Sequence, residues 1–323
     1  MNISILGCGR WGSFIAWYLN RNGHKVTTWG LDTDPYVTNF FATRKNNYVT
    51  FPQEIELTTD LPYAVEKNET IIISISSQSL RELMNKVNKL SGVDKKRFVL
   101  CMKGIEESTG ERLSQVLIDC GINPQNIAVW VGPGHIQAFT ENIPGVMVID
   151  SYNQELSKEL VNSFRSDLIK YYQGNDIIGT EIGAAAKNVI GIAAGMLDGL
   201  GYEALKGALM ARGTYEIAKL IEAAGGNKMS AYGLCHLGDY EATLFSPFSH
   251  NRKFGELFVK HEYFDKLAEG VKTSGALLKL AKEVGVEMPI TQTVYDIVNG
   301  NKETKKALLD LFDRANDVEF KFN

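Results

Sequence analysis

The chain has 323 residues, is 44% hydrophobic and 22% charged, and carries a formal net charge of −4. This length and balance are typical of a folded protein with two domains and exclude a disordered or fibrous chain. The small negative charge provides no overall basic surface, so neither nucleic acid nor an anionic membrane is an expected partner.

Cysteines and apolar segments indicate the cellular compartment. The cysteines show no CxxC spacing and predict free thiols in a reducing compartment, with no metal site; they are Cys8, Cys101, Cys120 and Cys235. The N-terminus lacks the basic start and long apolar segment of a signal peptide. The longest small and apolar run, 189–197, is far shorter than the ~20 residues that cross a bilayer. We therefore expect a cytoplasmic protein without membrane insertion.

The stretch GCGRWG near the N-terminus lies between the strand-like NISIL and the helical pattern FIAWYLNRNG. In such a strand-to-helix turn, Gly7 permits the tight turn and Gly9 lets the backbone approach a pyrophosphate, while Gly12 lets the helix pack closely on its strand. A plain glycine-rich turn is the alternative. The following strand KVTTWG and Asp32, about twenty residues after the last glycine, favour a dinucleotide site in which Asp32 meets the adenosine ribose.

Further strand-like runs alternate with helical patterns, as a doubly wound parallel sheet requires. The strands TIIISIS, RFVLCM, NIAVWV and GVMVID begin at Thr70, Arg97, Asn126 and Gly145. From Thr180 onward nearly every segment has helical period. The sequence therefore predicts an α/β fold with a dinucleotide-binding Rossmann-type domain over 1–178 and an all-α substrate and catalytic domain over 179–323.

Two lysines stand out from their surroundings. Lys187 and Asn188 lie in the middle of EIGAAAKNVIGIAAGMLDG, which is apolar on nearly every face and so predicts a buried helix. A buried lysine needs a partner, so Lys187 either reaches outward, neutralises a structural carboxylate, or donates a proton to a ligand. Lys103 follows the strand RFVLCM, and the carboxyl ends of strands in an open α/β sheet form the ligand crevice.

Two polar segments complete the candidate site. VGPGH, 131–135, offers glycine backbone at the end of the next strand, and HLGDYEATLFSPFSHNRKFG, 236–255, is rich in anion-binding donors. An ordinary loop and a solvated basic loop are the respective alternatives. Because the segments converge on the same rim, we expect a phosphate-bearing substrate.

With these residues in hand, the chain resembles the NAD(P)-dependent glycerol-3-phosphate dehydrogenases over nearly its whole length. The resemblance is carried by GCGRWG, CMKGIE, GTEIGAAAKNVIGIAAGMLDGLG and the run from Leu237 to Gly255, and AEGVKTS and GVEMPITQTVY add to it. It implies a Rossmann-type domain followed by a helical domain, and interconversion of dihydroxyacetone phosphate and glycerol 3-phosphate with NAD(H) or NADP(H). It also implies that the product supplies phospholipid synthesis.

The resemblance assigns roles to individual residues. Lys187 is the implied catalytic acid and base, and the groups around the reacting carbons are Lys103, Asn188, Asp239 and Thr243. The implied substrate-binding residues are Lys103, Gly132, Gly134, Ser249, His250, Asn251 and Arg252. The implied cofactor-binding residues are Gly7, Gly9, Arg10, Trp11, Gly12, Asp32, Lys103, Ile136 and Glu269. Chemically, an ammonium stabilises and protonates the oxygen that becomes negative on hydride transfer, and burial beside Lys103 lowers the pKa of Lys187 toward neutrality.

Four segments depart from the family pattern. The chain has Val131 and Gly134 where the family has serines, His250 where it has arginine, Ser76 for a proline, and Ala211 for a threonine. These departures leave the fold assignment intact and leave two alternatives open for function. One is a dehydrogenase of another small hydroxy or keto phosphate, and the other is a non-catalytic NAD(P)-binding regulator. Two cations facing one cleft argue against the regulator.

The choice of cofactor follows from the second strand. Asp32 and the absence of an arginine directly after the strand favour NADH, although Arg10 and Lys45 lie where they could reach a 2′-phosphate. The sequence leaves the oligomeric state open, with a homodimer as one option.

Overall fold

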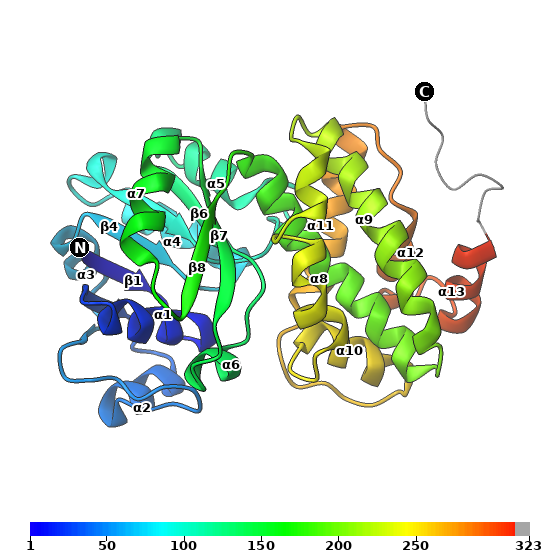
Figure 1. The fold of residues 1–323 in the computed structure, drawn as a ribbon, viewed down its shortest axis with the longest axis horizontal. Coiled ribbons are helices and arrows are strands. Elements are labelled where there is room, and N and C mark those ends of the chain that lie inside the picture. The colour runs from blue at the N-terminus through cyan, green and yellow to red at the C-terminus, as the bar shows by residue number, and fades with distance from the viewer. Residues whose placement is uncertain (314–323) are drawn as a thin grey trace.

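The computed structural model describes residues 1–313 and has two parts side by side, a sheet covered by helices and a cluster of helices (Figure 1). No strand occurs between 177 and 313. The helix α8 begins at Ile177, so the change from sheet to helices falls just before the boundary expected after residue 178.

The first part contains one eight-stranded sheet with the strand order β3-β2-β1-β4-β5-β6-β7-β8. The strands are β1 (Asn2–Leu6), β2 (Lys25–Trp29), β3 (Glu56–Thr58), β4 (Thr70–Ile73), β5 (Arg97–Leu100), β6 (Ile127–Val131), β7 (Gly145–Ser151) and β8 (Ile169–Gln173). The four strand-like runs after the first two strands are thus confirmed as β4 to β7.

One strand pair departs from the expected parallel arrangement, because β7 runs antiparallel to β6. The connection between them contains only the five-residue helix α6 (Ile136–Thr140). Such a helix is about 7 Å long, whereas a parallel crossover would have to span the ~23 Å of a seven-residue strand. The chain therefore turns back at the same end of the sheet.

Helices cover both faces of the sheet and bury its alternating side chains. On one face Ile72 and Val99 pack with α1 (Arg10–Arg21), α2 (Pro35–Thr43), α6 and α7 (Gln154–Phe164). On the other face Ile71 and Phe98 pack with α3 (Leu61–Lys67), α4 (Leu80–Val87) and α5 (Leu113–Asp119). Both faces of a parallel strand are apolar when helices cover them, which explains continuous runs such as TIIISIS.

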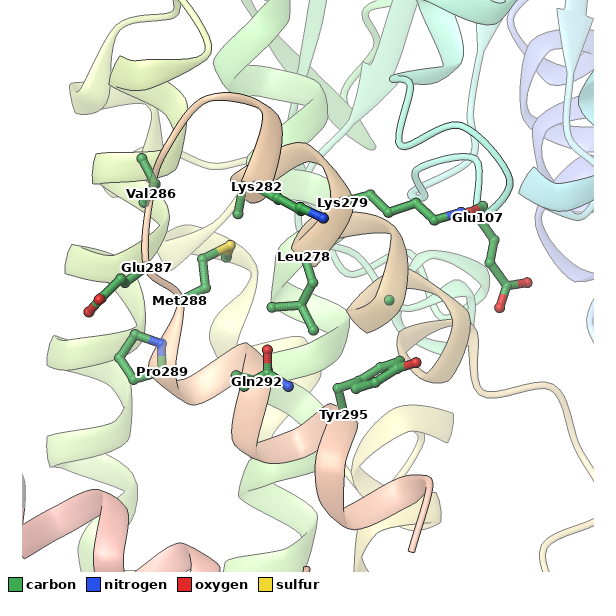
Figure 2. A pocket seen from close by; sticks show the side chains of 12 residues that line it. Glu107, Leu278, Lys279, Lys282, Val286, Glu287, Met288, Pro289, Gln292 and Tyr295 are labelled. Carbon is green, nitrogen blue, oxygen red and sulfur yellow. Dashed lines mark hydrogen bonds between the residues drawn. The ribbon is translucent and has the colours of Figure 1, made fainter. Parts of the chain in front are cut away.

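In the second part, α8 (Ile177–Gly199) is followed by five further α-helices within the described chain, of which the first four pack against α8 and the last packs against the fourth. They are α9 (Lys206–Ala223), α10 (His250–Val259), α11 (Glu269–Glu283), α12 (Pro289–Val298) and α13 (Thr304–Asp313). Beside α11 and α12 lies a groove of about 720 Å³, and Figure 2 shows Leu278 of α11 pointing toward Gln292 and Tyr295 of α12. None of the residues that line this groove also lines the cleft described below.

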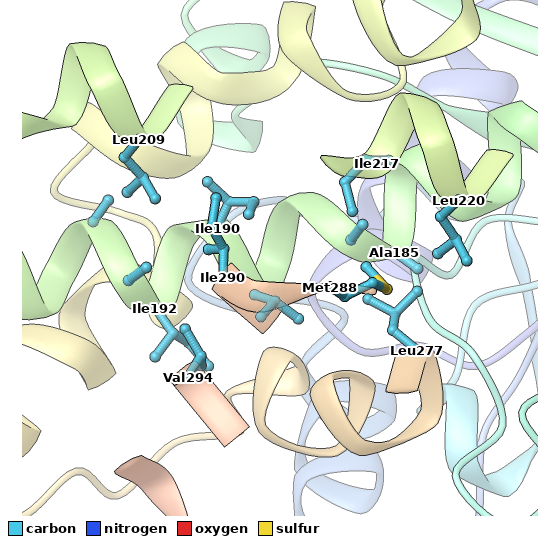
Figure 3. Close-up of a cluster of buried hydrophobic side chains, with 14 of the residues drawn as sticks. Ala185, Ile190, Ile192, Leu209, Ile217, Leu220, Leu277, Met288, Ile290 and Val294 are labelled. Carbon is cyan, nitrogen blue, oxygen red and sulfur yellow. The ribbon is translucent and has the colours of Figure 1, made fainter. Parts of the chain in front are cut away.

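The helical core is built around α8. Figure 3 shows side chains of α9, α11 and α12, among them Leu209, Leu277 and Val294, converging on this helix. Among the described residues, α8 is the one helix whose length and composition would suit a membrane span, and 94% of its most apolar 18-residue stretch is buried inside the protein. Its apolar surface is therefore accounted for by the core.

Two glycines set the distance between α8 and α10. A Cβ on Gly195 would lie 1.9 Å from the carbonyl oxygen of Arg252, and one on Gly255 would lie 2.1 Å from that of Ile192. The two backbones thus touch at both points. This contact fixes the position of the N-terminus of α10, which borders the cleft.

We predict that Gly255→Ala lowers the free energy of unfolding by about 2 kcal/mol or more, since α10 must move away from α8. Gly207→Ala is the matched control, because a Cβ on Gly207 of α9 meets nothing within 4 Å. It should raise stability by about 0.5 to 1 kcal/mol. Urea denaturation of both variants measures the difference, and equal effects would contradict the backbone contact.

Candidate functional site

A cleft of about 520 Å³ lies at the carboxyl ends of β1, β2, β4 and β5, where α8, α11 and the segment 239–251 close over it. This is the place where open α/β sheets bind ligands. Most of the predicted site residues line the cleft: Gly7, Gly9, Arg10, Trp11, Lys103, Gly134, Lys187, Asn188, Asp239, Thr243, Ser249, His250, Asn251 and Glu269. Five others do not line it: Gly12, Asp32, Gly132, Ile136 and Arg252.

The glycine turn has the geometry of a phosphate cradle. Gly7 has φ +111°, and a Cβ there would lie 2.2 Å from Ser74 O, while one on Gly12 would lie 2.0 Å from Gly7 O. Both glycines are therefore required by the close contact of helix and strand. A Cβ on Gly9, in contrast, meets nothing within 4 Å.

Open space beside Gly9 is what close approach of a pyrophosphate needs. Gly9 is also the N-cap of α1 and provides no side-chain acceptor for the first N–H groups of the helix. These N–H groups and the positive end of the helix dipole suit an anion. The turn thus fits a dinucleotide, with Gly12 acting through packing and not by contact.

The acidic residue that lines the cleft after β2 is not the one that the sequence predicts. Asp32 is exposed and does not line the cleft, whereas Leu31 and Asp34 do. The chain turns directly after β2, and the Asp34 carboxylate accepts a hydrogen bond from Tyr36 N at 2.9 Å as the N-cap of α2. At this end of the cleft the carboxylate is therefore that of Asp34 and not that of Asp32.

At the other end of the cleft a single carboxylate joins two lysines. Asp239 Oδ2 lies 2.6 Å from Lys187 Nζ and 2.7 Å from Lys103 Nζ. Lys187 also donates to Thr243 Oγ1 at 2.8 Å, and Lys103 donates to the carbonyl oxygen of Gly132 at 2.7 Å. The alternative of an outward-reaching Lys187 is excluded, because this residue is only 6% exposed.

Burial controls the acid–base properties of this cluster. Burial is the main cause that lowers the pKa of Lys187; Asp239 opposes it, nearby Lys103 adds to it, and together they bring the pKa to about 7. Burial likewise raises the pKa of Glu269 to about 7, against the effect of both lysines. The cleft thus holds an ammonium and a carboxyl group that both titrate near neutrality, which is typical of acid–base sites.

Two backbone features position these groups. Thr243 belongs to a π-helical turn, Glu241–Phe245, a distortion that is frequent at functional sites. Asn188 donates to the carbonyl oxygen of Lys103 at 3.0 Å and so ties α8 to the end of β5.

The N-terminus of α10, where the sequence predicts that a phosphate binds, borders the cleft. Ser249 is its N-cap and accepts from Arg252 N, and Asn251 Oδ1 accepts from Gly270 N at 2.9 Å, which joins α10 to α11. Burial and the charge of Arg10 lower the pKa of His250 below 6.5, so its ring is neutral at pH 7.

Arg252 turns away from the cleft. Its Nη1 lies 2.6 Å from Asp198 Oδ2, and its Nε donates to Ser246 O at 3.1 Å. Glu256 is a further partner at 3.5 Å. The guanidinium is therefore occupied within the protein, and the substrate contact expected of it is not supported by its position.

Known proteins with similar sequences identify the family to which this chain belongs. The NAD-dependent glycerol-3-phosphate dehydrogenase N-terminus model matches residues 2–157, and the corresponding C-terminus model matches residues 176–309. The chain belongs to this family. Glycerol-3-phosphate dehydrogenase (NAD(P)+) of Prosthecochloris aestuarii is 35% identical over 97% of this chain and 98% of its own length. That of Thermoanaerobacter is also 35% identical, over 97% of each chain.

Solved structures agree with the family assignment. The glycerol-3-phosphate dehydrogenase of Coxiella burnetii superimposes with a TM-score of 0.89 at 29% identity, covering 97% of this chain and 99% of that one. D-mandelate dehydrogenase with NADH, at 14% identity and a TM-score of 0.65, covers 95% and 99% and shares the fold.

A buried histidine behind the two lysines was not predicted from the sequence. His236 is fully buried, with Nδ1 at 2.9 Å from Gly183 O and Nε2 at 2.7 Å from the Tyr240 hydroxyl. A carbonyl only accepts, so Nδ1 carries the proton and Nε2 accepts from Tyr240. Burial lowers the pKa of His236 to about 4. Gly183 lies one helical turn before Lys187, so this neutral histidine holds the turn of Asp239 against α8.

A second overlooked contact joins the two parts of the protein. Arg112 Nη1 lies 2.7 Å from Glu181 Oε2, and Ser114 N donates to Glu181 Oε1 at 2.8 Å. The pair is buried and links the start of α5 to α8. Both residues are charged positions beside apolar runs, and their separation of 69 residues hides the pairing from sequence analysis.

We predict that Lys187→Met yields a folded protein that is more stable than the wild type near neutral pH. Asp239 keeps Lys103 as its partner, and the substitution removes a buried charge. Between pH 7 and 10.5 the unfolded chain binds a proton that the folded chain has lost, so wild-type stability rises with pH over this range. The advantage of the variant is therefore greatest below pH 7 and shrinks toward pH 10.

Chemical denaturation at pH 6 and pH 9 measures this difference. Lys86→Met is the control, since Lys86 pairs with Glu82 on the surface and should show no such pH dependence. A stability difference between Lys187→Met and wild type that is the same at both pH values would contradict the buried ammonium.

Proposed function

We propose that this protein interconverts dihydroxyacetone phosphate and glycerol 3-phosphate with NAD(H) or NADP(H). The observation that carries the proposal is the buried Lys187 ammonium, held by Asp239 in the same cleft as the open glycine turn. The family relatives named glycerol-3-phosphate dehydrogenase (NAD(P)+), which match nearly the whole chain, support it.

The nicotinamide cofactor, when bound at the glycine turn, supplies the hydride. The protein must then manage the charge that develops on the substrate oxygen. Lys187 has three N–H donors, and Asp239 and Thr243 take two of them. The third is free to hydrogen-bond the carbonyl oxygen and to transfer its proton as the hydroxyl forms.

The surroundings of Lys187 allow it to act in both directions. Its pKa of about 7 means that ammonium and free amine are both accessible at neutral pH. Asp239 orients the ammonium, and Lys103, which binds the same carboxylate oxygen, adds a second positive charge near the developing oxyanion. In the oxidative direction the free amine accepts the hydroxyl proton.

We predict that Lys187→Ala lowers kcat by about a hundredfold or more, as removal of a general acid does, while NADH affinity changes little. Steady-state kinetics with dihydroxyacetone phosphate and NADH fluorescence measure the two effects. Lys86→Ala, on the exposed surface of α4, is the control and should keep wild-type turnover. Retention of most activity in Lys187→Ala would make this lysine structural.

We predict that kcat depends on pH in opposite ways for reduction and for oxidation. Reduction needs the ammonium, so its kcat falls as pH rises through about 7, the pKa of Lys187. Oxidation of glycerol 3-phosphate needs the free amine, so its kcat rises through the same range. Profiles from pH 5.5 to 9 in both directions check this, and two profiles with the same slope would contradict the assignment.

We propose that NADH is preferred over NADPH. The cleft beyond β2 is lined by Trp29, Gly30, Leu31, Asp34, Tyr36 and Val37. None of these carries a positive charge for a 2′-phosphate, and the carboxylate of Asp34 repels one. Arg44, which follows α2, donates to the carbonyl oxygen of Pro52 instead.

The measurement is kcat/KM for each cofactor, and we expect the higher value with NADH. Leu31→Arg should raise kcat/KM for NADPH by about tenfold, as one charge-assisted hydrogen bond implies. Leu31→Gln is the control, because it adds a polar side chain without a charge and should not raise kcat/KM for NADPH to the same extent. A wild-type kcat/KM for NADPH equal to that for NADH would refute the preference.

The physiological direction that we propose is reduction in the cytoplasm, which supplies glycerol 3-phosphate for phospholipid synthesis. Growth of a glycerol 3-phosphate auxotroph carrying this chain, compared with Lys187→Ala, tests it.

A second candidate substrate, another small keto phosphate, is favoured by the neutral ring of His250 at the phosphate end. Oxidation of NADH with a panel of keto phosphates distinguishes the two substrates.

A further inference from the structure

Arg10 is a cation in the cleft that lacks a carboxylate partner. Its Nη2 donates to Gln137 Oε1 at 3.4 Å, and its guanidinium lies 5.6 Å from the centre of the Tyr48 ring. Its Nε is buried and has no hydrogen-bond acceptor. Within residues 1–313 no Asp or Glu oxygen lies within 4.0 Å of it.

Two other cations near this end of the cleft are largely buried and neutralised by carboxylates, whereas Lys266, whose charge also acts on His250, is exposed to solvent. Arg252 pairs with Asp198 and Glu256, and Lys206 pairs with Asp198. Arginine is rarely buried without a partner, because removing its charge from water is costly. Arg10 therefore differs from Arg252 and Lys206 in having a charge that no carboxylate of the described chain neutralises.

The surroundings of Arg10 indicate which bound anion would neutralise its charge. Its backbone belongs to the glycine turn, and its side chain reaches Gln137 on α6. His135, the N-cap of α6, has its ring 5.8 Å from that of Phe248, the residue before the N-cap of α10. His135 and His250 both line the cleft, and the charge of Arg10 lowers the pKa of each. Arg10 thus lies near the N-terminus of α10, on the substrate side.

We propose that Arg10 is the fixed positive charge that binds the phosphate of the substrate, opposite Ser249 and Asn251 at the N-terminus of α10. A guanidinium offers a permanently charged fork that matches two phosphate oxygens. The neutral ring of His250 can donate at most one hydrogen bond. This inference rests on the proposed function, and it makes Arg10 a determinant of substrate specificity.

The test compares a phosphorylated with an unphosphorylated substrate. Arg10→Gln keeps polarity and most of the length but removes the charge. We expect KM for dihydroxyacetone phosphate to rise by about tenfold to a hundredfold, as loss of a charged hydrogen bond implies. We expect kcat/KM for dihydroxyacetone and the Kd of NADH, measured by fluorescence, to change less than about twofold, since neither needs this charge.

Two further variants sharpen the result. Arg10→Lys should recover part of the affinity, because it restores the charge without the fork. His250→Arg in the Arg10→Gln background should lower KM for dihydroxyacetone phosphate again, since it returns a guanidinium to the same end. A weaker NADH affinity with an unchanged KM for dihydroxyacetone phosphate would overturn the proposal and assign Arg10 to the cofactor.

A binding measurement separates this inference from the proposed function. Calorimetric titration of inorganic phosphate into the NADH-saturated protein should give a Kd about tenfold weaker for Arg10→Gln than for wild type. If wild type failed to reduce dihydroxyacetone phosphate, the proposed function would be wrong, and this titration would still decide the role of Arg10. Equal phosphate affinity in both proteins would overturn the inference.

Discussion

The attraction of one carboxylate for two ammonium groups holds the functional site together. Asp239 is 1% exposed and lies between Lys187 of α8 and Lys103 at the end of β5. Each lysine alone would be costly to bury, and the carboxylate alone would be costly as well. Because Lys103 comes from the sheet and the other two from the helical part, the cluster exists only where the two parts meet.

Several contacts keep the two parts in that position. Asn188 bonds the backbone of Lys103, and Glu181 binds Arg112 at the start of α5. Both Asn188 and Glu181 lie on α8, as Lys187 does. One helix therefore carries the proton donor and the links to the sheet, so a shift of α8 would disturb chemistry and domain contact together.

Local sequence patterns were sufficient to predict most of the strands and the helical second part. Glycine spacing, strand-like runs and helical period predicted β1, β2, the strands β4 to β7 and a helical second part, because each depends on neighbours in the sequence. The direction of β7 depends instead on the length of α6 and on pairing with β6, which no local pattern encodes. The sequence also predicted that Lys187 needs a partner, since burial follows from composition.

The orientation of individual side chains could not be predicted in this way. Arg252 has the residue type and position of a phosphate ligand, yet its guanidinium pairs with Asp198, which is 54 residues away in the chain. Asp32 has the spacing of a ribose ligand, yet the turn after β2 places Asp34 in the cleft. His236 has no local signal, because its partner Gly183 is 53 residues away. In each case a contact distant in sequence decides what a side chain does.

The pairing of charges distinguishes structural from functional cations in this protein. Arg112, Lys206 and Arg252 have carboxylate partners within 2.7 Å, so their charges already stabilise the folded chain. Lys187 shares its carboxylate with a second lysine and keeps one N–H donor free. Arg10 has no carboxylate at all within the described chain. An anionic substrate can therefore bind at two places, at the free N–H donor of Lys187 through its reacting oxygen and at the guanidinium of Arg10 through its phosphate. The distance between Lys187 and Arg10 then sets the length of the substrate that can reach both residues.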